Sequence, residues 1–386
     1  MRLLLTLGVV LIAGCATVSD SSINPLNWFG SNSPAAKMAE LPEIKAAVVL
    51  PVLWQASAGS SGEAVFSPVI AKGSVFAAAV DGTVSRFDLS NGKQIWRVNA
   101  GERLSSGVGS DGDLVVVGTG KGDVIAMDAD GVVVWKAKVT SEVLAAAVVS
   151  GDQVIVRSAD SRIYGFNAKD GKRRWIYQRA TPTLAVRSPS GVAPFRGNLY
   201  AGFSGGKMIA LTSGNGNVRW EATVALPKGA TEIERVTDVV GLPFTSEREV
   251  CAVAYQGRVA CFDVTNGSVL WSRDMSSTSG VGGDMRIILV SDEKGGVHAL
   301  DRSSGNSLWK QDRLFLRNLS VPVSLGAQVV VADIQGYIHV LAHESGAFIG
   351  RAPTDGSPIS TNPIRFDRGF LVQTRNGNIF AFGLPQ

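Results

Sequence analysis

The sequence predicts an all-β protein: an eight-bladed β-propeller of four-stranded antiparallel blades, with the ring closed by pairing of the N- and C-terminal strands. Three observations predict it. A phrase ending in tryptophan recurs along the chain, its spacing fits one four-stranded blade per copy, and the two chain ends carry complementary incomplete copies.

The recurring phrase places a tryptophan four residues after a glycine. The glycine and tryptophan positions are 92 and 96, 131 and 135, 171 and 175, 216 and 220, 267 and 271, and 305 and 309. A seventh copy keeps Gly346 but has Gly350 where the tryptophan would stand. A tryptophan on an outer strand can cover the neighbouring blade and bury on the order of 200 Å². We therefore interpret the repeated tryptophans as structural; they are Trp54, Trp96, Trp135, Trp175, Trp220, Trp271 and Trp309.

Within each copy, short apolar runs such as Leu114–Val117 and Val329–Val331 are bounded by Gly, Asn and Asp, which is typical of strands between tight turns. A dipeptide ending in glycine separates two such runs. These dipeptides are Asp81-Gly82, Lys121-Gly122, Gln256-Gly257, Gln335-Gly336 and Asn376-Gly377. Glycine supplies the positive φ of a two-residue hairpin, so we predict two-residue turns here.

The tryptophan spacing gives the number of blades. Positions 54 to 350 span 296 residues in seven steps, about 42 residues each, which suits a four-stranded blade. The segment 376–382 is a copy that stops before its last strand, and Val52–Gln55 is a last strand with no copy before it. Together they complete an eighth blade and leave no open sheet edge.

The N-terminus predicts a lipoprotein. Arg2 precedes the apolar run 3–11, which is too short to span a bilayer, and Ile12-Ala13-Gly14-Cys15 follows. We expect a signal peptide at 1–14, a lipidated Cys15, a flexible tether to residue 45 and the propeller from 46 to 386; the alternative is an ordinary signal peptide with an incidental cysteine. Ala16 resembles the sorting position of Gram-negative lipoproteins bound for the outer membrane, where the chain would face the periplasm.

Composition and motifs argue against several functional classes. The net charge is only +4 and no basic run interleaved with aromatics occurs, so we expect no nucleic-acid partner. The three histidines are His298, His339 and His343, and a strand-and-turn pattern separates the last two, so we expect no metal site. No nucleophile motif stands out, and we expect neither catalytic residues nor a cofactor.

The repeat resembles that of quinoprotein-like propellers, most closely over Arg86–Trp96. This superfamily includes PQQ-dependent dehydrogenases, but the chain lacks the adjacent cysteine pair that resemblance would imply and is much shorter. It is more similar, over nearly its whole length, to the BamB family, the propeller lipoproteins of the outer-membrane β-barrel assembly (BAM) machinery. The segments Gly229–Val239 and Leu184–Ser188 carry this resemblance, although Val240 stands where the family tends to have a second aspartate.

The BamB resemblance implies that two loops bind a POTRA domain of BamA. Other assembly subunits and nascent outer-membrane proteins are further expected partners. Spacing indicates the same place independently: tryptophans lie 38 to 42 residues apart in most blades, but 45 apart from Trp175 to Trp220 and 51 from Trp220 to Trp271. Long loops on a rigid scaffold often carry binding function. The predicted partner-binding residues are Leu184, Val186, Arg187, Glu232, Arg235 and Asp238.

Three alternatives stay open. Leu184 and Val186 would instead begin a strand, or Arg187 and Asp238 would form an internal ion pair that orders the loops. The third is a different binding propeller, an adhesin or glycan-binding lipoprotein, which would expose aromatics in a central pocket.

Cys251 and Cys261 flank the Gln256-Gly257 turn. With a two-residue turn Cys261 faces Ala252, which disfavours a disulfide, although a shift of one residue would change this.

Overall fold

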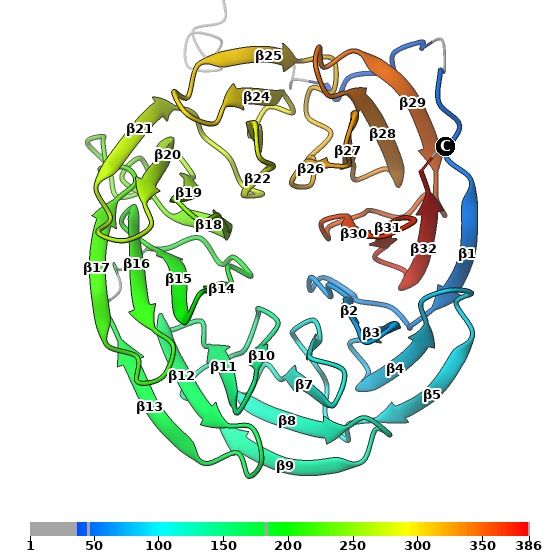
Figure 1. The fold of residues 1–386 in the computed structure, drawn as a ribbon, viewed down its shortest axis with the longest axis vertical. Coiled ribbons are helices and arrows are strands. Elements are labelled where there is room, and N and C mark those ends of the chain that lie inside the picture. The colour runs from blue at the N-terminus through cyan, green and yellow to red at the C-terminus, as the bar shows by residue number, and fades with distance from the viewer. Residues whose placement is uncertain (1–36, 45–46, 181, 183, 385–386) are drawn as a thin grey trace, which may run out of the picture. The chain divides into compact units, whose positions relative to one another are not determined.

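The computed structural model describes residues 37–44, 47–180, 182 and 184–384. The predicted signal peptide, Cys15 and most of the predicted tether, including Trp28 and Phe29, lie outside them. The described chain forms eight four-stranded antiparallel sheets arranged in a ring, as predicted (Figure 1). Among these residues, no helix is long and apolar enough to cross a membrane.

Seven blades are continuous in sequence. Blades one and two contain β2 (Val69–Ala71), β3 (Ser74–Ala78), β4 (Thr83–Asp88) and β5 (Gln94–Asn99), then β6 (Gly109–Ser110), β7 (Leu114–Gly118), β8 (Asp123–Asp128) and β9 (Val133–Lys138). Blades three and four contain β10 (Val148–Ser150), β11 (Gln153–Arg157), β12 (Arg162–Asn167) and β13 (Arg173–Gln178), then β14 (Val192–Phe195), β15 (Asn198–Phe203), β16 (Lys207–Thr212) and β17 (Val218–Thr223). Blades five and six contain β18 (Val239–Thr245), β19 (Glu249–Ala254), β20 (Arg258–Asp263) and β21 (Val269–Asp274), then β22 (Val281–Gly283), β23 (Ile287–Ser291), β24 (Val297–Asp301) and β25 (Ser307–Gln311). Blade seven contains β26 (Val323–Ser324), β27 (Gln328–Ala332), β28 (Tyr337–Ala342) and β29 (Phe348–Pro353).

Blade eight joins the two ends of the chain. It contains β30 (Ile364–Phe366), β31 (Gly369–Gln373), β32 (Asn378–Gly383) and β1 (Val52–Ser57). Strand β1 pairs antiparallel with β32, with Trp54 opposite Ala381 and Ser57 opposite Asn378. The predicted ring closure is confirmed.

Each outer-strand tryptophan packs against the following blade, which explains why the repeat couples tryptophan to glycine. The indole of Trp135 donates a hydrogen bond to Ala168 O (2.7 Å), and a Cβ added at Gly171 would lie 2.6 Å from Trp135 Cε3. The glycine also has φ of 68°, in the left-handed region that favours glycine. Equivalent tryptophan–glycine contacts recur around the ring, from Trp54 with Gly92 to Trp309 with Gly346. The hydrophobic core accordingly lies between neighbouring blades.

The missing tryptophan of blade seven marks the closure. In the other blades the indole packs against the turn between the third and fourth strands of the next blade. Blade eight has no such turn, because its third strand β32 and its fourth strand β1 come from opposite ends of the propeller. The entering segment fills this place: Ala47 N and Val48 N both donate to Ile349 O, at 2.8 and 2.9 Å. A Cβ added at Gly350 would lie 2.8 Å from Val48 O.

The predicted two-residue hairpins are wrong by one residue. In blade one, Ala79 N donates to Thr83 O, so three residues form the loop and Gly82 closes it at φ 98°. A type I turn followed by one left-handed residue gives this geometry. In the hairpin of blade five the left-handed residue is Gln256, at φ 48°, rather than Gly257.

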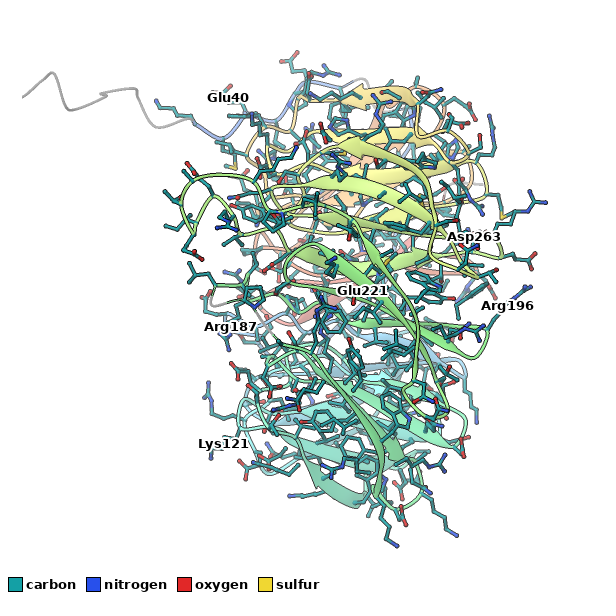
Figure 2. The ribbon with its side chains drawn as sticks, turned by 90° about the vertical axis from the view of Figure 1, so that its left-hand side faces the viewer. Glu40, Lys121, Arg187, Arg196, Glu221 and Asp263 are labelled. Atoms are coloured by element: carbon teal, nitrogen blue, oxygen red, sulfur yellow. A yellow bond between two sulfur atoms is a disulfide. The ribbon has the colours of Figure 1, made fainter. Side chains whose placement is uncertain are left out.

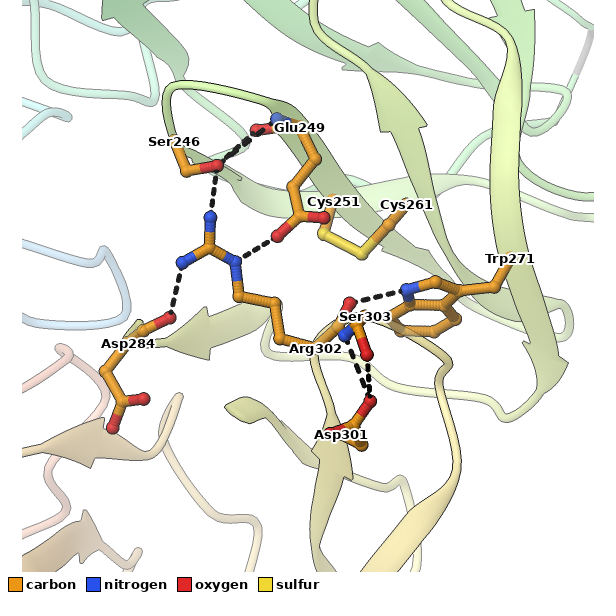
Figure 3. The surroundings of a disulfide bond; sticks show 9 residues. All are labelled: Ser246, Glu249, Cys251, Cys261, Trp271, Asp284, Asp301, Arg302 and Ser303. Carbon is orange, nitrogen blue, oxygen red and sulfur yellow. Dashed lines mark hydrogen bonds and ion pairs between the residues drawn. A yellow bond between two sulfur atoms is a disulfide. The ribbon is translucent and has the colours of Figure 1, made fainter. Parts of the chain in front are cut away.

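This register reverses the expectation for the cysteines. Cys251 lies directly opposite Cys261, and the two form a disulfide between β19 and β20. Both residues are fully buried, and the disulfide lies close to Trp271 and to Arg302, which pairs with Glu249 (Figure 3). An expected two-residue turn would have put the sulfurs on opposite sides of the sheet.

Removing the disulfide is expected to destabilise the protein measurably. Replacing both Cys251 and Cys261 by alanine should lower the free energy of unfolding by about 2–3 kcal/mol, because the unfolded chain regains the entropy of a short closed loop. Urea unfolding of the variant and of the oxidised wild type measures this. Adding a reductant should affect only the wild type, and an equal response in both proteins would contradict the assignment.

The packed part of the chain begins before the predicted boundary at residue 46. Arg317 is almost fully buried, pairs with Asp333 (2.6 Å) and donates a hydrogen bond to Ala39 O (2.9 Å). Arg351 donates to Pro42 O at 2.8 Å. These guanidinium groups hold the segment 38–44 against blade seven.

The same cluster predicts pH-dependent stability. His339 is fully buried, its Nε2 lies 2.9 Å from Asp333 Oδ2, and Arg351 Nε donates to its Nδ1 (3.4 Å). Burial, with the charges of Arg351 and Arg317, holds the pKa of His339 below its ordinary value despite the opposing Asp333. Below a pH of about 6.5 the unfolded chain takes up a proton that the folded chain resists. The free energy of unfolding therefore decreases as the pH is lowered, by at most about 1.4 kcal/mol per pH unit.

We expect His339→Gln to reduce this slope between pH 6.5 and 5. Chemical unfolding at several pH values measures the difference between the variant and the wild type. Parallel slopes would mean that His339 accepts its proton as readily in the fold as in the unfolded chain.

Candidate docking surface

The two longest connections between blades lie on one face of the ring. Residues 179–191 join β13 to β14, and residues 224–238 join β17 to β18. Seen from the side, Arg187 lies on the same face as the Lys121 hairpin, while Asp263 and Arg196 lie on the opposite face (Figure 2). The predicted placement of the long loops beside the glycine hairpins is confirmed.

The first loop exposes apolar side chains beside a cation. Leu184 is 44% exposed and Val186 38%, and neither belongs to a strand, because β14 begins at Val192. The alternative that they begin a strand is therefore wrong. The Arg187 side chain is largely exposed, and its Nη2 lies 3.7 Å from Glu142 Oε1.

The second loop is ordered by a local motif that the sequence analysis missed. Thr231 Oγ1 accepts a hydrogen bond from Glu234 N (3.2 Å), and the Glu234 carboxylate accepts from Ala230 N (2.8 Å) and Thr231 N (3.1 Å). Donation by the Thr231 backbone, with that of Ala230, holds the pKa of Glu234 below its ordinary value. This is the capping-box pattern of Thr-x-x-Glu, which can be read from sequence. It leaves Glu232 and Arg235 exposed.

Asp238 joins the two loops from within. It is only 4% exposed, and its carboxylate accepts hydrogen bonds from Val186 N and from Gly205 N (3.2 Å). Its backbone carbonyl also accepts from Tyr255 N at 2.8 Å. The alternative of an Arg187–Asp238 ion pair is wrong. Arg187 pairs with Glu142, and Asp238 accepts hydrogen bonds from backbone amides instead.

All six predicted residues lie around two adjoining hollows. One, of about 320 Å³, is lined by Val186, Arg187 and Asp238 among others. The other, of about 180 Å³, is lined by Leu184, Glu232, Arg235 and Asp238. The lining residues, which lie between positions 142 and 239, are thus brought together from blades three, four and five and the connections beside them.

The structure adds three residues to this surface. Leu226 and Ile233 expose large apolar side chains on the second loop, and Arg157, at the end of β11, lines the larger hollow. Ile233 lies inside the segment Gly229–Val239 that carries the BamB resemblance. Nothing periodic in the sequence indicates Arg157.

Two aspartates of the repeat stabilise their own hairpin turns. Asp88 accepts hydrogen bonds from Ser90 within its turn, and Asp301 does the same for Ser303 and Ser304. Among residues 37–384 that are described, no group of three or more His, Cys, Asp or Glu side chains is arranged to hold a metal ion.

Comparison with known proteins identifies the family. A family profile described as outer membrane protein assembly factor BamB matches residues 51–102 and 80–311. BamB of Bordetella pertussis is 42% identical over 373 residues, covering 96% of this chain and 95% of that protein. BamB of Nitrosomonas eutropha is 41% identical over 380 residues, covering 97% and 93%.

Solved structures agree. The crystal structure of BamB from Moraxella catarrhalis matches with a TM-score of 0.80 and 28% identity, over 87% of this chain and 100% of that one. Quinohemoprotein alcohol dehydrogenase from Comamonas testosteroni matches with a TM-score of 0.64 at 14% identity, over 87% of this chain and 78% of that one, which shows a shared fold alone. The chain therefore belongs to the BamB family of outer membrane protein assembly factors.

Proposed function

We propose that this protein is a non-enzymatic scaffold of the machinery that assembles outer-membrane β-barrel proteins, and that it binds a POTRA domain of the central barrel subunit, BamA. Its relatives are named outer membrane protein assembly factors, which supports the general role. The observation that carries the docking site is the convergence of six predicted residues around two hollows on one face.

The residues of this surface would act in different ways. Leu184 and Val186 supply apolar anchors beside the exposed charge of Arg187, a composition favoured at interface hot spots. Glu232 and Arg235 form a charged rim, where contacts affect the association rate more than the affinity. Asp238 is a positioning residue, because it is buried and fixes the backbone of Val186.

The proposal includes the membrane link predicted from the N-terminus. A signal peptide at 1–14, lipidation at Cys15 and a tether would hold the ring at the periplasmic side of the outer membrane. A multiply acylated cysteine anchors stably, whereas one acyl chain does not. Glu40, in the segment that leads into the propeller, lies on the face that carries Arg187 (Figure 2). A tether starting there would keep the docking face near the membrane-bound machinery, where nascent outer-membrane proteins are also handled.

Direct binding tests the proposal. Calorimetric titration of the full-length chain, purified in detergent, with the isolated POTRA array of BamA from the same organism should show saturable one-to-one binding. Absence of binding by a folded chain, at concentrations up to the millimolar range, would overturn it.

A further inference from the structure

The larger hollow contains an arginine, Arg157, that forms no ion pair with any described residue. Arg157 lines this cleft and is half-buried, and its Nη1 is fully buried without a hydrogen bond to any described residue. Its guanidinium carbon lies 4.6 Å from the centre of the Phe203 ring. Burial lowers the pKa of Arg157 to about 10, so the side chain stays charged at neutral pH. A charge withdrawn from water is costly unless an opposite charge compensates it.

The nearby carboxylates are engaged elsewhere. Asp238 is the anion that raises the pKa of Arg157 against the effect of burial, but its two oxygens accept from Val186 N and Gly205 N. Glu142 accepts a hydrogen bond from Ser141 and lies 3.7 Å from Arg187. Neither is within bonding contact of the Arg157 guanidinium.

The rest of the cleft offers hydrogen-bond donors. Ser161, Ser188, Ser190 and Ser204 line it, and the Ser188 and Ser190 hydroxyls lie 2.9 Å apart, sharing one hydrogen bond. Its volume of about 320 Å³ is enough for an entering side chain. Arg187 lies at the lip, exposed, so that a group entering from the docking face meets both guanidinium groups.

We propose that this cleft is the receptor for an acidic side chain of the docked partner, whose carboxylate pairs with Arg157 inside the cleft and with Arg187 at its lip. The inference deepens the proposed docking function and rests on it. A carboxylate is the occupant that fits, because it compensates the uncompensated guanidinium and accepts from the serine hydroxyls at the same time.

The test compares three full-length variants in the same POTRA titration. Arg157→Met removes the charge at similar side-chain length, and Arg157→Lys keeps a cation. Arg313→Met is the matched control, since Arg313 is an exposed arginine on the connection between blades six and seven, stacks on Phe348 as Arg157 stacks on Phe203, and lines neither hollow. Arg157→Met should weaken binding about tenfold or more, Arg157→Lys less, and Arg313→Met less than about twofold.

Stability separates a binding role from a structural one. Because Arg157→Met removes a half-buried charge without breaking an ion pair to any described residue, its thermal unfolding midpoint should equal or exceed that of the wild type. A lower midpoint together with weaker binding would make Arg157 part of the fold and overturn the inference. So would unchanged binding by Arg157→Met, whereas failure of the wild type itself to bind would count against the docking function.

The partner's residue can then be identified. Each Asp and Glu on the POTRA surface is changed to Asn or Gln and titrated against wild type and Arg157→Met. One change should weaken binding to the wild type and have little further effect in Arg157→Met, as expected for a coupled pair. If instead inorganic phosphate raises the unfolding midpoint of the wild type alone and no partner residue couples to Arg157, the cleft holds a free anion and the proposal is wrong.

Discussion

Replacing Leu184 by glutamate together with Arg187 by alanine should abolish co-purification with the barrel subunit while leaving thermal unfolding nearly unchanged. Leu184 is 44% exposed, and among the described residues Arg187 forms one ion pair, with Glu142 at 3.7 Å. Exposed substitutions of this kind usually change stability by about 0.5 kcal/mol or less, and a surface ion pair contributes little. In an interface the same positions would lose an apolar anchor and a cation, each costing about 2 kcal/mol or more.

The measurement is a pull-down from detergent-solubilised envelopes, accompanied by thermal unfolding of the purified variant. A matched control is Met285→Glu with Arg286→Ala. These neighbours are likewise an exposed apolar residue and an arginine with a surface partner, Glu344, but they lie in the first hairpin of blade six, at the opposite end of the strands. The control should co-purify normally. If binding and stability fall together in the first variant, Leu184 and Arg187 belong to the fold rather than to an interface.

The predictable part of this fold is the part encoded by contacts that repeat. A tryptophan such as Trp135 needs a residue without a side chain in the next blade, at Gly171, and that requirement recurs at a fixed distance along the chain. The number of blades follows from this pair of positions, and ring closure follows from the incomplete copies at 376–382 and Val52–Gln55. The exception has the same cause. Gly350 replaces the tryptophan of blade seven because blade eight has no turn between β32 and β1 against which an indole could pack.

The hairpin register was not predictable from the same signal. A glycine after Asp81 or Gln256 is compatible with both two-residue and three-residue loops, and the choice between them moves every later residue to the other side of the sheet. A loop longer by one residue than expected therefore places Cys251 directly opposite Cys261, instead of opposite a neighbouring residue. Turn geometry, rather than cysteine spacing, decides whether this disulfide forms.

The docking surface was predictable in position but not in detail. The tryptophan spacing located it beside the family resemblance, because intervals of 45 and 51 residues stand out among intervals of 38 to 42. Asp238 accepts a hydrogen bond from the amide of Val186, 52 residues away. Arg157 lies in its hollow beside residues of the 179–191 loop, which joins blades three and four. Contacts made once, between distant segments, leave no periodic trace in the sequence.

Trp54→Ala is expected to damage the protein more than the same change in any continuous blade. Trp54 and Trp135 are equally buried, and both donate an indole hydrogen bond to the next blade, to Leu89 O (2.9 Å) and Ala168 O (2.7 Å). Each loss should cost about 3–5 kcal/mol through the cavity left behind. The two strands are held differently, however. A turn links β9 directly to β8, whereas β1 is joined to its partner β32 only through the whole ring.

Losing Trp54 removes the side chain that anchors β1 to the next blade, and leaves the β1–β32 ladder and the entering segment around Val48 to hold the strand. Release of β1 would expose the edge of β32, which is a template for pairing with other chains. Native-state hydrogen exchange should show faster exchange along β1 and the facing edge of β32 in Trp54→Ala, at concentrations where Trp135→Ala keeps β8 and β9 protected. Concentration-dependent association should accompany it. Equal protection of β1 and β9 in the two variants would mean that pairing of the chain ends, and not the tryptophan, closes the ring.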